Sequence, residues 1–386
     1  MLRVGILLPR STLFPSLGLD ILDGIKQYLK YQNIFEDIKF LIENIGFGIE
    51  EPEIYSKAEK LVLQEDVDMV IVCADTVISE MLQPLFTASN KILLVVNFGA
   101  NLPQNWQTAP TTITHSLNFC WHTRLTGKLA AATSANKKVI NIMSYYDSGY
   151  RQAYSMMMGN QEFGGEPLFN HVTHLKDNEF TLEPIATFLQ KNDDVKKVLC
   201  LFTDIQAALF YKEILPLQQQ HSLHLFVSPM MFDESLKPQL GDDIVLKNIK
   251  GYLPWHPSLN NENNTIFKEY YKSATNKIAN YFSLLGWEAG MLVEQIFKQK
   301  NADNNTAAAI VKSISQFILP SPRGWLKVDA ATNLTYGASY LANCSNNFDI
   351  TLSNEVDNLE EEWTEFVNQR IPKEESSGWR NTYLCI

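Results

Sequence analysis

The sequence predicts an α/β protein with two doubly wound parallel-sheet lobes joined by about three hinge crossovers. The chain has 386 residues, enough for two domains of the usual ~100–200 residues. Short apolar segments alternate with amphipathic helical patterns along most of its length. Several of these segments end in a short polar turn that opens a helix, most clearly at residues 139–152. Open α/β folds bind small molecules at the carboxyl ends of their strands, so a ligand is expected at these turns.

The first lobe begins with a strand at residues 4–8 and a helix that Ser16 is expected to cap. The continuous apolar run at residues 67–73 predicts a strand covered on both faces, as in a parallel sheet. The other elements expected in this series are strands at 38–42 and 92–96 and helices at 53–64 and 77–85. The polar stretch at 102–112 predicts a connection, and the chain is expected to cross to the second lobe near 116–121.

The second lobe is predicted from a further series of strand and helix patterns. Its expected strands are residues 139–143, 168–174, 198–202, 223–227 and 249–255. Three later helices are more than this sheet needs, so the chain is expected to return to the first lobe. These helices are expected at residues 264–273, 283–299 and 307–317, with later strands at 325–328 and 336–341. Lobes that are discontinuous in sequence suit hinge closure around a ligand.

The domain boundaries follow from these crossings. Lobe 1 is predicted to comprise residues 1–117 and 253–329, and lobe 2 residues 118–252 and 330–350. Residues 351–386 are predicted to form a C-terminal piece. It would contain a short acidic surface helix around residues 355–362, near Trp363 and Phe366, and a polar tail at 373–378.

Composition excludes several classes of function. The formal net charge of −11 disfavours nucleic acid and anionic membrane surfaces as partners. Five scattered cysteines show no CxxC spacing, and His115 and His122 lack a third ligand with suitable spacing, so no metal site is expected. The common nucleophile, zinc-protease, P-loop and dinucleotide motifs are missing from the sequence, so neither a cofactor nor an enzymatic activity is expected.

No export signal precedes the first strand, and no apolar run reaches the ~18 residues of a spanning helix. Two expectations remain open from this observation. Either the protein stays in the cytoplasm, or a signal peptide has been removed from the sequence.

Four motifs together resemble the type 1 periplasmic binding-protein fold, in particular the branched-chain amino-acid (leucine/isoleucine/valine) binding-protein family of ABC importers. They are residues 4–9 (VGILLP), 146–150 (YDSGY), 285–292 (LGWEAGML) and 322–329 (PRGWLKVD). The resemblance covers residues 4–341. It implies a monomeric periplasmic protein that binds an amino acid between its lobes and delivers it to a membrane permease.

In that family, hydroxyl and backbone N–H groups of the first lobe hold the ligand's carboxylate. The resemblance implies that Thr76, beside Asp75, makes such contacts. The loop after the next strand would contribute Asn97, Phe98, Gly99 and Ala100. Arg10 and Phe14 follow the first strand, where Arg10 would either form a salt bridge at the rim or bind a ligand carboxylate. For Thr76 and Asp75 the alternative is a helix N-cap.

The second lobe would contribute Tyr150, Asp204, Gln206, Met231 and Phe232. Tyr150 matches a ligand-contacting tyrosine of the family. Asp204 is the candidate partner for a ligand ammonium group, with a helix N-cap as the alternative. Phe14, Phe98, Met231 and Phe232 are apolar loop residues that either line a small-molecule cleft or pack within their loops.

The sequence therefore predicts a solute-binding protein that captures a small polar or amphipathic metabolite, foremost an amino acid, for ABC-type uptake. The alternative is a cytoplasmic ligand sensor of the same fold that regulates a partner protein.

Overall fold

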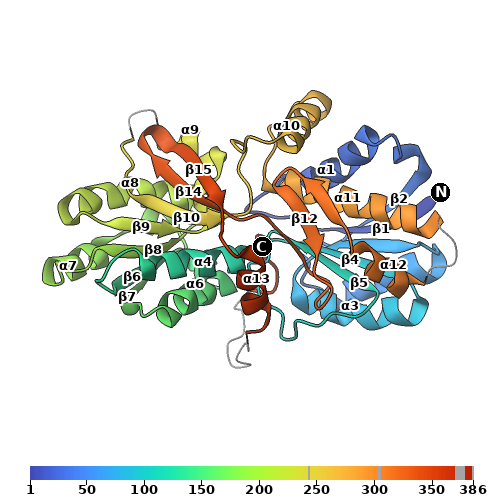
Figure 1. The fold of residues 1–386 in the computed structure, drawn as a ribbon, viewed down its shortest axis with the longest axis horizontal. Helices are drawn as coiled ribbons and strands as arrows, with labels where there is room; N and C mark the ends of the chain where they lie inside the picture. Colours follow the sequence, from blue (N-terminus) through green and yellow to red (C-terminus); the bar gives the residue numbers. More distant parts are fainter. Residues whose placement is uncertain (242–243, 302–305, 370–378, 385–386) are drawn as a thin grey trace. The chain divides into compact units, whose positions relative to one another are not determined.

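The computed structural model describes residues 1–241, 244–301, 306–369 and 379–384. The chain forms two compact units. Unit 1 comprises Met1–Leu117, Leu259–Ala338 and Trp363–Ile386, and unit 2 comprises Asn118–Ser258 and Ser339–Glu362. Each contains a sheet of parallel strands flanked by helices (Figure 1), so the predicted α/β class is confirmed.

The observed boundaries differ from the predicted ones after the first crossing. The predicted change of lobe at residue 330 lies at Ser339 instead, because strand β13 (Thr335–Gly337) pairs with β12 (Gly324–Val328) inside unit 1. The C-terminal piece predicted at 351–386 is divided between the two units. Of this piece, the predicted polar tail at 373–378 lies outside the described residues.

The main sheet of unit 1 has the strand order β2-β1-β3-β4-β5, with all neighbours parallel. Its strands are β1 (Leu2–Leu8), β2 (Ile38–Asn44), β3 (Met69–Cys73), β4 (Ile92–Asn97) and β5 (Thr112–Ser116). Strand β5 was not predicted, because its residues TITHS have no apolar run. Those polar side chains are nevertheless buried, and Thr335 forms a hydrogen bond with His115 at 3.0 Å.

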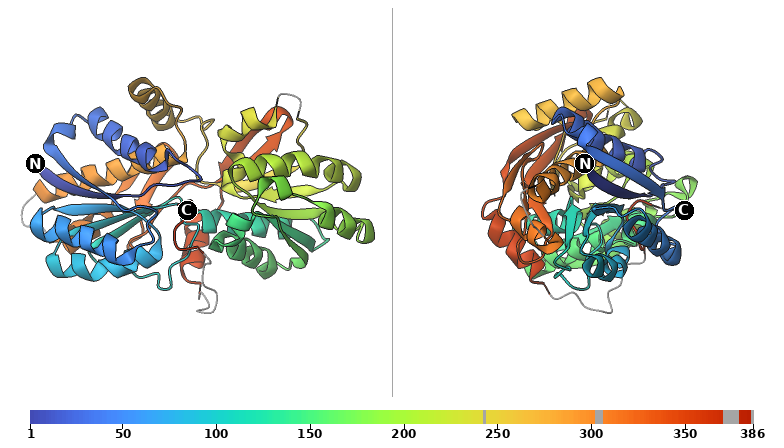
Figure 2. Two further views of the ribbon diagram at one scale, coloured as in Figure 1. Left: turned by 180° about the vertical axis from the view of Figure 1, so that it is seen from behind. Right: turned by 90° about the vertical axis from the view of Figure 1, so that its right-hand side faces the viewer.

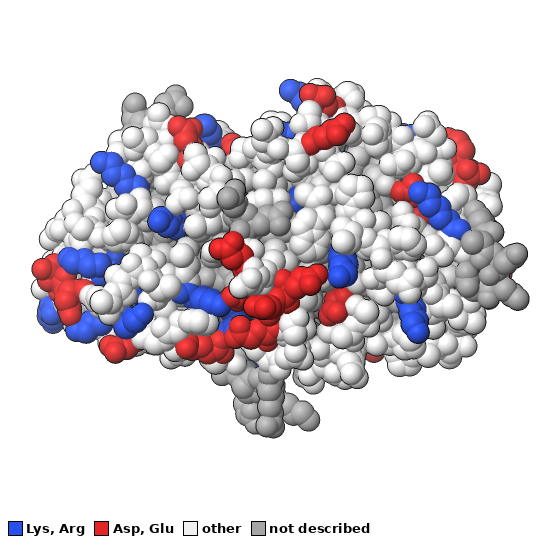
Figure 3. All heavy atoms as spheres, in the orientation of Figure 1, with Lys and Arg blue, Asp and Glu red and all other residues white. Residues whose placement is uncertain are grey.

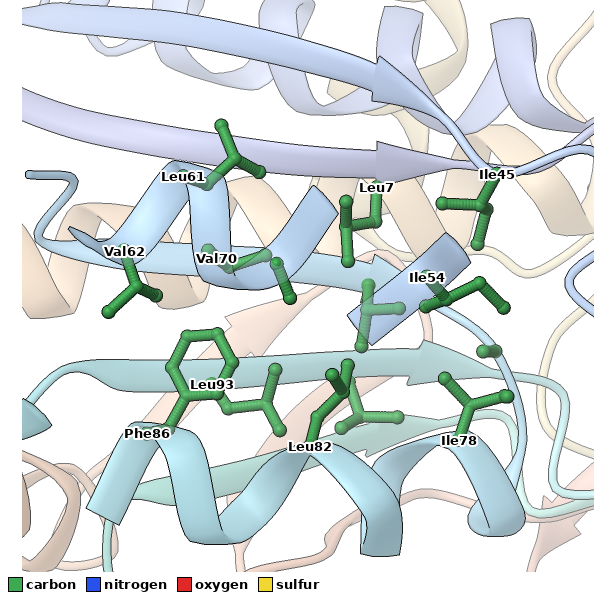
Figure 4. Packing of buried hydrophobic residues seen from close by; sticks show 14 of the residues in the cluster. Leu7, Ile45, Ile54, Leu61, Val62, Val70, Ile78, Leu82, Phe86 and Leu93 are labelled. Carbon is green, nitrogen blue, oxygen red and sulfur yellow. The ribbon is translucent and has the colours of Figure 1, made fainter. Parts of the chain in front are cut away.

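Helices cover both faces of this sheet. They are α1 (Leu17–Tyr31), α2 (Glu51–Glu59), α3 (Thr76–Ser89), α10 (Glu262–Thr275), α11 (Tyr281–Asn301) and α12 (Ala307–Ile314). On one face, Leu7, Val70 and Leu93 pack against α2, α3 and the π-helical turn η2 (Lys60–Gln64) (Figure 4). Helices α1 and α11 pack closely on each other, since a Cβ on Gly24 would lie only 2.3 Å from the carbonyl oxygen of Ser283.

A small antiparallel sheet, β11 (Ile318–Ser321), β12 and β13, completes unit 1. The single strand predicted at 336–341 is two strands, because the chain changes unit between β13 and β14 (Tyr340–Ser345). Beside β11, the fully buried Glu288 accepts a hydrogen bond from Arg323 at 2.8 Å.

The sheet of unit 2 has the order β15-β14-β10-β9-β8-β6-β7. Its remaining strands are β6 (Lys138–Met143), β7 (Glu166–Val172), β8 (Lys197–Leu201), β9 (His224–Val227), β10 (Ile249–Leu253) and β15 (Asp349–Glu355). Strands β6 to β10 are parallel, whereas β14 and β15 are antiparallel additions at one edge. Its helices are α4 (Phe119–Ala132), α5 (Tyr145–Ser148), α6 (Arg151–Glu162), α7 (Glu183–Lys191), α8 (Asp204–His221) and α9 (Lys237–Leu240), which Figure 2 shows from two further sides.

Helix α13 (Leu359–Val367) corresponds to the predicted acidic helix but begins four residues later than predicted. Its first turn holds Glu360, Glu361 and Glu362, and acidic side chains gather over this part of the face in Figure 3. Its other side is buried, because the Trp363 ring stacks on Tyr336 at 4.9 Å between centroids. Across the described residues, none of the helices is both long enough and apolar enough to cross a membrane.

Candidate ligand-binding site

The carboxyl edge of the unit 1 sheet is the candidate site. The chain leaves β1 toward β2 on one side and returns to β3 on the other, which creates a topological switch point between β1 and β3. Open α/β sheets bind ligands at such a point. A small cavity there is lined by residues that follow β1, β3 and β4 and by three residues near the C-terminus: Pro9, Leu17, Ile21, Cys73, Ala74, Asp75, Val96, Asn97, Phe98, Asn381, Thr382 and Leu384.

Asp75 is the central polar group of this edge. It stands at the N-cap position of α3 and is only 3% exposed, but its side chain makes no capping hydrogen bond. Its Oδ2 instead accepts hydrogen bonds from Asn101 Nδ2 at 2.8 Å, from the Thr382 backbone N–H at 2.8 Å and from the Thr382 hydroxyl at 2.6 Å. Burial raises the pKa of this carboxyl group, and the three donated hydrogen bonds oppose that shift.

The C-terminal residues 379–384 lie against this edge. The Asn381 side chain bridges two loops: its Oδ1 accepts from the Asp75 backbone N–H at 2.9 Å, and its Nδ2 donates to the Gly48 carbonyl. The Ser11 hydroxyl donates to the Tyr383 carbonyl. The segment is thereby bonded to the loops that follow β1, β2 and β3.

Aromatic rings form the apolar part of the site. The fully buried Tyr383 ring makes edge-to-face contacts with Phe14 and Phe98, at centroid distances of 5.4 and 5.1 Å. Both phenylalanines also contact Phe282, near the start of α11. The two candidate phenylalanines of this unit therefore lie together around one ring supplied by the C-terminal segment.

The other candidate residues of unit 1 lie around this core. Asn97 is buried, and its Oδ1 accepts from the Gly99 N–H at 3.0 Å, which shapes a turn where Gly99 has φ +64°. Ala100 is buried, and Thr76 is the half-buried first residue of α3. Arg10 is exposed, with its guanidinium 4.7 Å from the centroid of the Phe47 ring.

Asn101 was expected in the loop after β4, where it stands in place of a hydroxyl residue of the family, and it bonds Asp75. Ser11, Phe282 and the C-terminal residues were not predicted as parts of this edge. The C-terminal residues follow Asp75 by some three hundred positions, and Thr382 carries no motif that would connect it to that loop.

Unit 2 has a corresponding edge at the switch point between β6 and β8. Here the buried Asp147 accepts hydrogen bonds from the hydroxyls of Ser144 at 2.5 Å and Thr203 at 3.3 Å. The Ser144 Oγ also accepts from the Asp147 N–H at 2.9 Å, which forms a capping arrangement at the start of α5. Burial raises the pKa of Asp147 to about 6. The sequence analysis missed this pair, although a serine three residues before an acid after a strand was a usable signal.

The structure separates the unit 2 candidates into different surroundings. Tyr150 is buried at the N-cap position of α6. Asp204 is the half-buried first residue of α8, with a left-handed φ of +48°, and the N-cap position belongs to Thr203. The Gln206 side chain accepts a hydrogen bond from the Thr173 hydroxyl and donates one to the Asp177 carboxylate. Met231 and Phe232 are fully buried in the 3-10 turn η4 (Pro229–Phe232).

The chain matches the family described as periplasmic binding protein over residues 1–349, and it therefore belongs to that family. This confirms the predicted family resemblance and the predicted type 1 fold. No curated protein sequence matches the chain significantly.

Solved structures of similar fold include three solute-binding proteins of ABC transporters. A protein from Rhodopseudomonas palustris in complex with benzoate has 20% identity and TM-score 0.72, covering 92% of this chain and 96% of its own. A substrate-binding protein from Sphaerobacter thermophilus has 14% identity and TM-score 0.75, covering 92% and 97%. A branched-chain amino acid binding protein from Streptococcus pneumoniae in complex with isoleucine has 13% identity and TM-score 0.69, covering 92% and 99%. At these identities, the likeness establishes the fold alone.

Proposed function

We propose that this periplasmic binding protein is the solute-binding component of an ABC importer. It would act in the periplasm as a monomer and bind its solute without catalysing a reaction. Membership of the family and the similarity of its fold to three ABC transporter proteins support this proposal. The proposed ligand is a small polar or amphipathic metabolite that carries a hydrogen-bond donor, foremost an amino acid or an amino-acid amide.

The buried Asp75 carboxylate at the unit 1 switch point is the observation that carries the ligand class. A charge in this environment requires donors close to it, because an unpaired buried carboxylate is costly. In the structure Asn101 and Thr382 supply these donors, and a ligand ammonium or amide group would take the place of the two Thr382 donors through charge-assisted hydrogen bonds. The rings of Phe14 and Phe98 would receive the apolar part of the ligand. In unit 2, Tyr150 and Asp204 remain the proposed ligand contacts.

The same observation distinguishes amino acids from aromatic acids. A related structure holds benzoate, so an anionic ligand is the competing candidate. None of the described residues that line the unit 1 cavity is basic, whereas one of them is Asp75. A carboxylate placed there would be repelled by a carboxylate. A donor-bearing ligand is therefore favoured over a simple benzoate.

A thermal-shift screen of the 386-residue chain tests this proposal. The screen compares amino acids and their amides with the matched deaminated acids and with benzoates. A ligand present at 100 times its Kd should add about 2.7 kcal/mol to the free energy of unfolding. Stabilisation by donor-bearing compounds would support the proposal. Stabilisation by benzoates or deaminated acids alone would refute the ligand class.

A further inference from the structure

The C-terminal residues 381–384 occupy the same edge of unit 1 that the proposed function assigns to a ligand. All four are buried, including Thr382 and the fully buried Tyr383. With these residues in place, the remaining cavity measures about 10 Å³. That is room for about one water molecule. An amino acid cannot enter this cavity while the segment is seated.

The contacts of the segment are those that a small ligand would make. Its backbone N–H and hydroxyl donate to Asp75, its carbonyl accepts from Ser11, and its ring contacts Phe14 and Phe98. The carboxyl edge of an α/β sheet is where separate small molecules bind. In this protein, one segment of the same chain makes both the hydrogen bonds and the ring contacts of the edge.

We propose that residues 381–384 are an internal ligand of the unit 1 site, and that the free ligand with which they compete presents hydrogen-bond donors beside an aromatic ring. A peptide and an aromatic amine share this chemistry. A simple aromatic carboxylate does not, because it would place an anion at Asp75. The inference rests on the proposed function, since it assigns the same edge to a ligand.

Covalent attachment determines the strength of this competition. Because the segment belongs to the same chain as the site, it competes at an effective concentration that does not change when the protein is diluted. A free ligand binds only the fraction of molecules in which the segment is displaced, so its apparent Kd rises as that fraction falls. Weakening the segment's own contacts should therefore tighten ligand binding while leaving Asp75 and its loop unchanged.

The experiment uses the 386-residue protein and two variants of residues 380–383. T382V/Y383A removes the hydroxyl that bonds Asp75 and the ring that contacts Phe14. The matched control is R380A, which removes an exposed ion pair with Glu51 and leaves the contacts with Asp75 and Phe14 in place. Three probes are titrated by calorimetry: the peptide acetyl-Asn-Thr-Tyr-Leu-amide, tyramine, and 3-(4-hydroxyphenyl)propionate. The last probe is an aromatic carboxylate of similar size to tyramine.

We expect T382V/Y383A to bind the peptide or tyramine at least about tenfold more tightly than wild type and R380A do. If only the peptide binds more tightly, the ligand is a peptide. If only tyramine does, the ligand is an aromatic amine. Equal affinities in all three proteins would overturn the internal-ligand proposal. Preferential binding of the carboxylate probe would overturn the proposed ligand chemistry.

Hydrogen exchange of the Thr382 amide in wild-type protein separates this inference from the proposed function and does not depend on a variant. A stabilising amino acid should accelerate this exchange, because it displaces the segment that Asp75 holds. If the amino acid binds and the exchange rate does not change, the proposed function stands and the internal ligand is refuted. If the peptide binds T382V/Y383A while no amino acid binds any form, the internal ligand stands and the small-solute function is refuted.

Discussion

The carboxyl edges of the two units have the same architecture, but the hydrogen-bond donors to the buried aspartate come from different parts of the chain in each. The orders β2-β1-β3-β4-β5 and β7-β6-β8-β9-β10 correspond strand by strand. Each switch point holds a buried aspartate, Asp75 in unit 1 and Asp147 in unit 2. Asp147 accepts hydrogen bonds from the hydroxyls of Ser144 and Thr203, which lie in the loops that follow β6 and β8 of its own sheet. Two of the three donors to Asp75 Oδ2 come from Thr382, near the end of the chain.

Two sheets with the same strand order can therefore use their carboxyl edges for different purposes. Ser144 and Thr203 follow β6 and β8, which pair with each other, so the Asp147 arrangement is part of the folded sheet. Remote partners can leave without disturbing the strand order, so the Asp75 arrangement can exchange one set of donors for another. An edge whose buried acid can exchange its donors suits ligand binding. An edge whose donors belong to its own sheet suits structural support.

The largest expected effect comes from removing the acceptor in unit 1. Asp75→Ala would leave the Thr382 N–H and hydroxyl and the Asn101 amide without their shared acceptor. Buried donors that lose an acceptor cost about 1–3 kcal/mol each, so we expect the seated segment to lose roughly 3 kcal/mol. Hydrogen exchange of the Thr382 amide should accelerate by about a hundredfold or more. Asp147→Ala is the control and should leave this amide protected.

A smaller effect is expected from the two threonine hydroxyls. Thr382→Val removes a hydrogen bond of 2.6 Å to Asp75, and Thr203→Val removes one of 3.3 Å to Asp147. Bonds to charged acceptors contribute about 1.5–3 kcal/mol when the geometry is good. We expect a loss near the lower end of that range for Thr382→Val and less than about 1 kcal/mol for Thr203→Val. Denaturant unfolding measures both, and Thr382→Ser should retain wild-type stability. A larger loss in Thr203→Val than in Thr382→Val would invalidate this ranking.

The pH dependence of stability should report on Asp147. Its pKa is raised by burial to about 6, so the folded state binds the proton more tightly than the unfolded chain does. The free energy of unfolding should therefore increase as pH falls through about 6 toward the unfolded pKa of about 3.9. Between pH 7.5 and 5 the expected gain is about 1–2 kcal/mol.

Unfolding curves of Asp147→Asn test this assignment, because the amide keeps the shape but does not titrate in this range. The variant should lose that part of the pH dependence. Asp75→Asn provides the comparison, since burial also raises the pKa of Asp75. An unchanged pH dependence in Asp147→Asn would assign the proton uptake to another group.

The smallest expected effect concerns Asp204. Its left-handed φ of +48° is more easily adopted by glycine, so Asp204→Gly should raise stability slightly, by about 0.5 kcal/mol, and Asp204→Ala should lower it. Binding of an amino acid and its deaminated analogue to Asp204→Asn tests the ammonium hypothesis. A greater loss for the amino acid would support that role, whereas equal losses would leave Asp204 with a structural role only.

Much of the fold was predictable because local patterns carry it. The apolar run that became β3 and the strand, turn and helix around Tyr150 were recognisable from neighbouring residues alone. Strand β5 was not predictable in this way, because its threonines and histidine become buried only when Thr335 lies beside them. The burial of Met231 and Phe232 likewise depends on the elements around η4 rather than on their own loop.

Local sequence patterns predicted the alternation of strands and helices, the two sheets and the loops at which polar side chains gather. Periodicity and turn residues act over a few positions, and they were sufficient for that outcome. The partners of the two buried acids depended on the tertiary structure, apart from Ser144, which lies three residues before Asp147. Thr203 lies 56 positions from Asp147, and Thr382, which supplies two donors to Asp75, lies 307 positions from it. Hydrogen bonding of a buried carboxylate depends on proximity in space, which local sequence patterns do not encode.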